Sequence, residues 1–476
     1  MRKRKYLCFG IVIAMLFTIT GCQSSNKSEL DASHPTHITV WHYYNGAQLD
    51  SFNRLVDKFN NTVGKEKGIV VEASSQGTVN DLENHILDSI HGKVGAEKMP
   101  NIFAAYADTA YKVDQMGYVQ NLNTYFTKEE RKQYIDSYID EGIFKGQLKI
   151  FPVAKSTEVI MLNKTDWDKF SQACHVSTST LSTYEGLVKT AKQYYDWTDS
   201  LTPEANDGKA LFGRDAMANY FIVGLKQHGI DVFSVDKKGK VKLNFDKKVV
   251  RKLWNNYYVP YIKGYFTSSG RFRSDDIKTG NVLCYIGSSS SATYFPKTVY
   301  DDNESSHDIT SAVLPAPTFK GQKKVAVQQG AGMVVTKAKK KKIEACKEFL
   351  KWFTQDKQNI DFSISSGYLP VTKSGNKIKK VRKYTSKKNA GDVVEVAVKT
   401  VNTSKMYTSK AFENGTSARK VLEYSLQDKA SADRQSVIKY LDEGMDYQTV
   451  IDMFDNNENF NDWYNETYQK LQSLVK

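Results

Sequence analysis

Residues 40–46 of this 476-residue chain end a strand-like run with four ring-bearing side chains in a row: Trp41, His42, Tyr43 and Tyr44. Residues 38–40 favour a strand and Asn45-Gly46 favours a turn. A second group follows the short apolar run after Pro100: Tyr106, Asp108 and Tyr111. Ligands of parallel α/β sheets bind beyond the carboxyl ends of the strands, so both loops are predicted to face one crevice. We therefore name five substrate-binding candidates: Trp41, Tyr43, Tyr44, Tyr106 and Asp108. For Trp41 alone, a place in the core explains the ring equally well.

Residue patterns for covalent or metal chemistry are missing from the sequence. The eight histidines show no HxxxH or HExxH spacing, and no Walker-type glycine-rich loop occurs. Asp108 has no convincing acidic partner for a two-carboxylate glycosidase. We therefore predict a binding protein without catalytic residues, cofactor or metal. A surface glycan-active enzyme remains the rival hypothesis.

The N-terminus indicates export. Residues 2–5 are basic, residues 7–20 are mostly apolar but too short to span a bilayer, and Cys22 follows small residues. This arrangement resembles a bacterial lipobox, which implies that residues 1–21 are a signal peptide and that Cys22 carries the lipid (palmitate) anchor. An ordinary signal peptide with an incidental cysteine is the alternative. Residues 22–36 are polar and are predicted to form a flexible tether.

The formal charge is +14, and it falls to about +10 once the four basic residues of the signal are removed. The excess is spread along the chain apart from the run KAKKKK at 337–342, which we interpret as a solvated helix start. No interleaving of basic and aromatic residues suggests nucleic acid. Binding of anionic wall polymers stays an unsupported alternative, and solvated lysines are the simpler interpretation.

Three cysteines remain beyond Cys22, namely Cys174, Cys284 and Cys346, and their wide spacing predicts neither a disulfide framework nor a metal site. Cys346 shares a helical apolar stripe with Phe349, Leu350 and Phe353, which places it in the core.

The mature chain of about 440 residues exceeds one hydrophobic core, so two or three domains are expected. Strand-like runs alternate with helical patterns. Phe52, Leu55, Val56 and Phe59, for example, repeat at helical spacing between the strands predicted at 38–41 and 68–72. This alternation predicts an α/β fold with mostly parallel sheets. The last hundred residues are largely helical in pattern, with Leu422, Leu426 and Ile438 among the apolar positions.

Four ordered stretches carry a family resemblance: FPVAKSTEVIMLNKTDW (151–167), VLPAPTFKGQ (313–322), QQGAGMVVTKA (328–338) and SGYLPVTKSG (366–375). Together they resemble the extracellular solute-binding proteins of ABC importers, the family that includes maltose- and glycerol-phosphate-binding proteins. The resemblance implies a type II periplasmic-binding-protein-like fold with two α/β lobes and a ligand cleft at the hinge. Lobe 1 would hold residues 37–153 and 328–369, and lobe 2 residues 154–327 and 370–476.

The same resemblance nominates further ligand groups. KSTE replaces the glutamate of maltose-binding relatives at the first crossing, which moves the pattern toward the glycerol-phosphate type. The residues that match are Ser156, Thr157, Ser288, Ser289, Gly330, Gly332, Tyr368 and Arg419. Arg419 would face a ligand or would pair with Glu423 one helical turn on. Asp215, Asn219 and Tyr220 would reach the cleft or serve as a helix start and core.

The resemblance implies a lipid-anchored, monomeric receptor on an extracellular membrane face, of Gram-positive type, which hands its ligand to ABC permease subunits. Rings with hydrogen-bonding neighbours suit the C–H faces and hydroxyl rims of a sugar. The expected ligand is therefore a carbohydrate or polyol. The alternative is glycerol-3-phosphate, a glycerophosphodiester or a sugar phosphate, and a wall-binding lipoprotein is a third class.

Overall fold

The computed structural model describes residues 29–236, 239–300, 305–385 and 391–475. The predicted signal peptide and Cys22 lie outside the described residues. No helix within the described ranges is long and apolar enough to cross a membrane.

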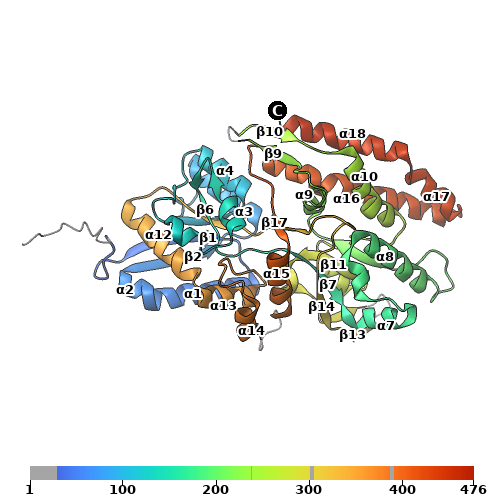
Figure 1. Cartoon of the computed structure of the whole chain (residues 1–476), viewed down its shortest axis with the longest axis horizontal. Coiled ribbons are helices and arrows are strands. Elements are labelled where there is room, and N and C mark those ends of the chain that lie inside the picture. Colours follow the sequence, from blue (N-terminus) through green and yellow to red (C-terminus); the bar gives the residue numbers. More distant parts are fainter. Residues whose placement is uncertain (1–28, 237–238, 301–304, 386–390, 476) are drawn as a thin grey trace, which may run out of the picture.

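Lobe 1 is built on a five-stranded sheet in the order β2-β1-β3-β16-β6 (Figure 1). The strands are β1 Thr36–His42, β2 Ile69–Ser75, β3 Ile102–Ala105, β16 Gly332–Val335 and β6 Ile150–Phe151. β1 pairs in parallel with β2 and with β3, whereas β16 is antiparallel to both β3 and β6. The sheet is therefore mixed, because β16 returns from the other lobe and enters in the opposite direction.

The helices of lobe 1 cover this sheet: α1 Gly46–Phe59, α2 Lys65–Lys67, α3 Val79–His91, α4 Ala107–Gln115, α5 Lys128–Arg131, α6 Asp136–Glu141, α12 Lys340–Phe353 and α13 Asp356–Ser366. A short π-helical turn, Asn60–Gly64, joins α1 to α2, and the hairpin of β4 Ile143–Phe144 and β5 Gln147–Leu148 precedes β6. The helical pattern of α1 is confirmed, since Phe52, Leu55, Val56 and Phe59 are all buried. Thr78 and Asp81 form a capping box at the start of α3.

Lobe 2 is built on a four-stranded sheet in the order β14-β7-β11-β8. Its strands are β7 Glu158–Asn163, β8 Ala210–Arg214, β11 Val282–Ser288 and β14 Ser311–Pro315. Only the β11–β8 pairing is parallel, while β7 is antiparallel to β11 and to β14. The predicted α/β fold is confirmed, but the prediction of mostly parallel sheets is wrong, because both sheets are mixed.

The remaining α-helices, α7 to α11 and α14 to α18, pack on lobe 2: α7 Lys164–Cys174, α8 Tyr184–Asp199, α9 Met217–Gln227, α10 Lys247–Ile262, α11 Arg273–Lys278, α14 Ile378–Thr385, α15 Gly391–Thr403, α16 Gly415–Asp442, α17 Tyr447–Phe454 and α18 Asn457–Leu474. Short 3-10 helices span Thr178–Ser182 and Ser289–Tyr294. The small strand pairs are β9 Phe233–Val235 with β10 Val241–Leu243, β12 Thr298–Tyr300 with β13 Ser306–Asp308, and β15 Val325–Val327 with β17 Lys405–Tyr407. The predicted helical character of the last hundred residues is confirmed by α16, in which Leu422, Leu426 and Val437 are buried and Ile438 is exposed.

Three backbone segments cross between the lobes. Lys155 pairs with Leu369, and Ser156 pairs with Gln329, so the first crossing lies between the other two. Buried Lys155 fixes the first crossing through Glu141 at 2.8 Å and the carbonyl oxygen of Gly330 at 2.7 Å. Leu369 packs in a core cluster of lobe 2, whereas Val371 packs in the core of lobe 1. The last crossing therefore contributes side chains to both cores, and the lobe boundaries stay a prediction.

The core position of Cys346 is confirmed, since it is buried with Phe349, Leu350 and Phe353. Cys174, Cys284 and Cys346 are all free thiols. The lysine run begins α12 with exposed side chains, as predicted. The described part of the expected tether, residues 29–36, is packed against lobe 1 through Leu30 and a backbone hydrogen bond from Thr36 to Gly68.

Candidate functional site: the interface between the lobes

Two tyrosines of lobe 1 form a ring platform toward the interface. Tyr43 follows β1 and Tyr106 caps the start of α4, and their rings stack with centroids 6.4 Å apart and planes 16° from parallel. Tyr106 is 39 % exposed, so one ring of the pair remains accessible. The Tyr43 hydroxyl accepts from the backbone N–H of Ala331 at 3.3 Å and lies 3.5 Å from the hydroxyl of Tyr368. These bonds tie the platform to two crossing segments.

The other two predicted rings lie deeper. Trp41 is only 4 % exposed and belongs to the core of lobe 1. Tyr44 is buried against Phe52, Phe362 and Tyr368. In this conformation both rings are part of the core of lobe 1, beneath the platform. The alternative that Trp41 is a core residue therefore describes its position.

Asp108 lies where the lobes touch. It stands in the first turn of α4, beside the start of α16 in lobe 2. A β-carbon on Gly415 would come within 2.2 Å of Asp108 Oδ1, so a side chain here would force the Asp108 carboxyl group, or the lobe that carries it, to move. Burial raises the pKa of Asp108 to about 6, although Arg419 and the backbone N–H of Phe412 favour its charged form.

Arg419, on the first turns of α16, is held within lobe 2. Its Nη2 donates to Asn219 Oδ1 at 2.7 Å. Glu423, the alternative partner, accepts instead from the backbone N–H groups of Met217 and Ala218, at 3.0 and 2.9 Å. Glu423 therefore caps α9, whose own N-cap residue, Ala216, has a left-handed backbone and no capping side chain.

Asn219 connects Arg419 to the hinge. Its Nδ2 donates to Glu158 Oε1 and to Gln329 Oε1, both at 2.9 Å. Glu158 also accepts from Arg214 Nη2 at 2.7 Å, in a buried ion pair at the edge of the lobe 2 sheet. Burial alone would lower the pKa of Arg214, but the adjacent Glu158 carboxylate raises it. Of the two alternatives for Asn219, cleft or core, its bonds place it in the interface network. Tyr220 is instead a buried core residue, and its hydroxyl donates to the carbonyl of Leu253.

The serine, threonine and glycine candidates line the crossings. Thr157 Oγ1 donates to the carbonyl of Val327, and Ser156 exchanges backbone hydrogen bonds with Gln329. Ser288 lies half-buried with its Oγ 2.8 Å from that of Ser290. Ser289 is fully buried and its Oγ has no partner among the described atoms. Gly330 has a left-handed φ of 93°, and both Gly330 and Gly332 pass close to neighbouring backbone.

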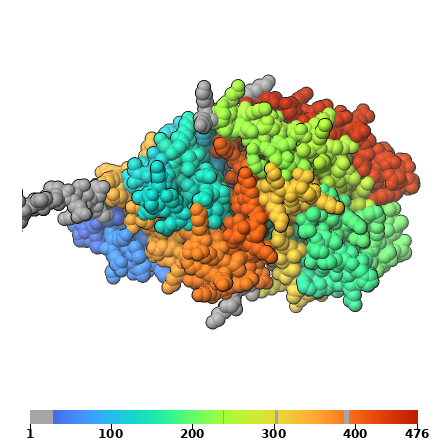
Figure 2. Space-filling model, viewed as in Figure 1, coloured from blue at the N-terminus to red at the C-terminus, as the bar shows by residue number. Residues whose placement is uncertain are grey.

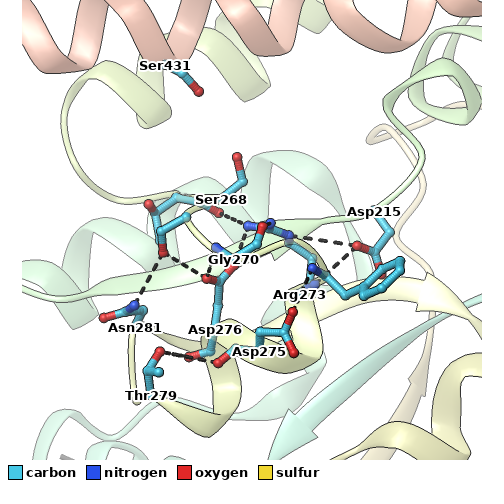
Figure 3. Close-up of polar contacts among 12 residues, drawn as sticks. Asp215, Ser268, Gly270, Arg273, Asp275, Asp276, Thr279, Asn281 and Ser431 are labelled. Atoms are coloured by element: carbon cyan, nitrogen blue, oxygen red, sulfur yellow. Dashed lines mark hydrogen bonds and ion pairs between the residues drawn. The ribbon is translucent and has the colours of Figure 1, made fainter.

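Asp215 and the loop 267–273 form a polar network on lobe 2 (Figure 3). Asp215 follows β8, and its Oδ1 accepts from the backbone N–H of Arg273 at 3.2 Å. Burial raises the pKa of Asp215 to about 6, against the opposing effect of Arg273. The Arg273 guanidinium also pairs with buried Asp276, whose Oδ1 accepts from the backbone N–H of Gly270 at 2.7 Å. This network fixes the loop and leaves Phe272 54 % exposed at its tip.

Sequence reasoning missed the pairing of Asp215 with Arg273, because no local pattern links two residues 58 positions apart. Asp215 itself stood at a strand end, and that position was the usable hint.

Further polar contacts join the lobes away from the crossings. Tyr294 of lobe 2 donates to Asn45 Oδ1 at the start of α1. Gln48 Nε2 donates to the carbonyl of Ser290 at 3.3 Å. Together with the approach of Asp108 to Gly415, they show the lobes in contact along the interface.

A separate cavity of about 450 Å³ lies within lobe 2, bounded by Glu158, Tyr184, Gln227 and β15. It meets the interface network through Glu158 and through Tyr184, whose hydroxyl accepts from Arg214 Nη1 at 3.2 Å. The described residues contain no group of histidine, cysteine and acidic side chains that could hold a metal ion.

Comparison with known proteins agrees with this architecture. Residues 54–390 match the family described as bacterial extracellular solute-binding protein. The chain belongs to that family. A search of curated protein sequences finds no significant match.

Solved structures of this family share the two-lobed fold. The cyclic α-maltosyl-1,6-maltose binding protein of Arthrobacter globiformis is 15 % identical, with a TM-score of 0.68 over 93 % of this chain and 99 % of that one. UgpB of Mycobacterium tuberculosis, solved with glycerophosphocholine, is 15 % identical, with a TM-score of 0.66 over 92 % and 98 %. A substrate-binding protein of Listeria monocytogenes, solved with cycloalternan, is 16 % identical, with a TM-score of 0.63 over 91 % and 99 %. At these identities the likeness establishes the fold of this solute-binding protein and not its ligand.

Proposed function

We propose that this solute-binding protein is the receptor of an ABC importer and captures a neutral carbohydrate between its lobes. A lipid on Cys22 would anchor it to the membrane. The protein would act as a monomer on the extracellular face and deliver its ligand to permease subunits. The family supports solute capture, and the Listeria relative is named as an ABC substrate-binding protein. Two of the three structures above are named for binding a cyclic oligosaccharide or contain one.

The observation that carries the ligand class is the stacked pair of Tyr43 and Tyr106 beside Asp108. An accessible ring accepts the C–H face of a sugar, and a carboxylate accepts hydroxyl hydrogen bonds. On lobe 2, exposed Phe272 and half-buried Asp215 offer the same two kinds of chemical group, and we propose that they meet the other side of the sugar. A ligand that touches both sets stabilises the closed arrangement, because only differential contacts shift a conformational equilibrium.

A phosphorylated ligand is the second candidate, and the glycerophosphocholine complex of UgpB is the observation that favours it. Against it, Arg419 already donates to Asn219. The two interface carboxylates would also repel a dianion, so binding would require their protonation. The neutral sugar is therefore the better-supported ligand.

A thermal-shift screen tests the proposal with the chain from Ser24 onward. Mono- and oligosaccharides, polyols, glycerol phosphates and phosphodiesters are each added to the protein. A ligand at 100 times its Kd stabilises the folded state by about 2.7 kcal/mol, which raises the melting temperature by a few degrees. We expect a shift with a neutral oligosaccharide. We also expect it to disappear in Tyr106→Ala.

Tyr424→Ala is the matched control, because Tyr424 is a 57 % exposed tyrosine on α16. It should keep the shift. A shift with phosphorylated ligands only, lost in Arg419→Ala, would move the assignment to the glycerol-phosphate class. No shift with any compound would contradict the import role and favour a wall-binding lipoprotein.

A further inference from the structure

The lysine run that begins α12 is not explained by ligand capture. Lys337, Lys339, Lys340 and Lys342 are exposed, and the first turn of α12 contains no acidic residue. Cations near a helix N-terminus oppose the helix dipole, so the stability of α12 does not account for this cluster. An anionic partner outside the fold would give these lysines a role beyond solvation.

The chain enters the folded part beside these lysines. Lys341 Nζ donates to the carbonyl of His34 at 3.3 Å, and Lys340 Nζ lies 3.8 Å from Glu29 Oε1. On the other side, a β-carbon on Gly68 would lie 1.9 Å from the carbonyl oxygen of Asp31, so residues 29–36 press on the turn after α2. The first described residues therefore emerge between α2 and α12, at the end of lobe 1 far from α17 and α18 (Figures 1 and 2).

Lysines dominate the surface around this exit. We define the basic exit face as Lys65, Lys67, Lys337, Lys339, Lys340, Lys341 and Lys342. Lys67 bonds to Glu348 at 2.5 Å, which places α2 directly beside α12. The acidic residues on the same face are Glu29, Asp31, Glu66, Glu344 and Glu348, and the last two have largely covered side chains. The lysines outnumber them, so the face keeps a positive excess.

The number of residues between Cys22 and the first described residue limits how far the basic exit face can lie from the membrane. Seven residue steps separate Cys22 from Glu29, a reach of about 25 Å when fully extended. If Cys22 carries the lipid, as proposed above, the exit face is the part of the fold nearest the bilayer. Electrostatic attraction is strong within about one Debye length, roughly 8 Å at physiological salt, and the short tether lets the lysines come that close.

We propose that the basic exit face rests on the anionic phospholipid headgroups of the membrane that anchors the protein. The lipid and the lysines then act together, and the contact orients lobe 1 end-on to the bilayer. Each basic residue near an anionic surface adds to the attraction, and salt weakens it.

Vesicle sedimentation tests the proposal without the lipid anchor. Every described helix and strand lies within residues 36–474, so the chain from Ser24 keeps the whole fold. This chain is mixed with vesicles of phosphatidylcholine alone or with added phosphatidylglycerol. We expect binding only to the anionic vesicles, with loss at high salt. Changing Lys337, Lys339, Lys340 and Lys342 together to Gln should lower the partition coefficient at least about tenfold.

The matched control changes four exposed lysines of lobe 2 to Gln: Lys189, Lys209, Lys248 and Lys252. It removes the same charge and should retain most of the binding. Equal loss in both variants would reduce the effect to net charge and overturn the proposal. So would binding to purified anionic wall polymer with none to vesicles. The sugar screen tests the ligand without vesicles, and fractionation of cells that carry Cys22→Ala tests the lipid anchor. The vesicle experiment tests the basic exit face, so failure of one proposal is distinguishable from failure of the others.

Discussion

Asp108 and Asp215 stand on opposite lobes, and burial raises the pKa of each carboxyl group to about 6. Each keeps a basic neighbour that limits the effect, Arg419 for Asp108 and Arg273 for Asp215. Both groups thus sit close to a change of charge in mildly acidic surroundings. Their protonation alters the stability of the fold as well as the polarity of the interface.

The contribution of Asp108 to the free energy of unfolding should therefore fall as the pH rises from about 4 to 6. The unfolded carboxyl titrates near its ordinary value, whereas the folded one holds its proton to about pH 6, so the folded state binds more protons in this window. Asp108→Asn removes this contribution, roughly 1–2 kcal/mol. Urea unfolding should show that Asp108→Asn gains stability relative to the unchanged protein when the pH is raised from 4.5 to 7. Exposed Asp50→Asn is the control, and the same stability difference between Asp108→Asn and the unchanged protein at both pH values would refute the assignment.

At the residue scale, sequence reasoning predicted which residues lie near the interface better than it predicted their burial and their bonding partners. The strand-end rule brought Tyr43, Tyr106 and Asp108 to the interface. It did not separate them from Trp41 and Tyr44, because adjacent rings on one turn look alike until the packing around them is known. The bond between Arg419 and Asn219 depends on how α16 crosses α9, and no local pattern encodes that crossing.

At the element scale, α16 is the helix that organises the interface. Its start receives Asp108 from the other lobe, its first turns present Arg419, and its Glu423 caps α9. The sequence predicted a helix here. Its length and its use as a cap for a neighbour follow from tertiary contacts, which override local signals.

Gly415→Ala tests the close approach of α4 to α16. The added methyl would lie 2.2 Å from Asp108 Oδ1, so we expect the lobes to separate and the radius of gyration from X-ray scattering to increase. Adding Asp108→Ala removes the obstacle and should restore the compact value. This pair is a double-mutant test of one contact. An increase that persists in the double variant would mean that Gly415 acts through the helix itself.

At the scale of the whole molecule, the contact of Tyr294 with Asn45 joins the rims of the lobes. Tyr294→Phe removes that hydrogen bond, worth about 1 kcal/mol, and should raise the ligand dissociation rate about fivefold with little change in association. Stopped-flow fluorescence with the oligosaccharide found in the screen measures both rates. Tyr424→Phe should leave them unchanged. A slower association instead would show that Tyr294 acts before closure.

The fold was the most predictable level. Alternating strand and helix periodicities gave the α/β class, and the ordered stretches at the crossings gave two lobes. The direction of β16 and β7 within their sheets was not predictable, because periodicity reports which residues are buried and says nothing of strand polarity.

The three crossings have a mechanical consequence. Three backbone segments lie side by side, with residues 155 and 156 bridged to residues 369 and 329 on either side, and so form a narrow ribbon instead of a single pivot. Such a ribbon bends easily about an axis that runs across all three segments. Twisting the ribbon would instead shear the backbone bridges between neighbouring segments. Motion of one lobe against the other is thereby confined to a single axis, like the leaves of a door. A sugar bound to one leaf would then meet the opposing side chains in the same register at every closure.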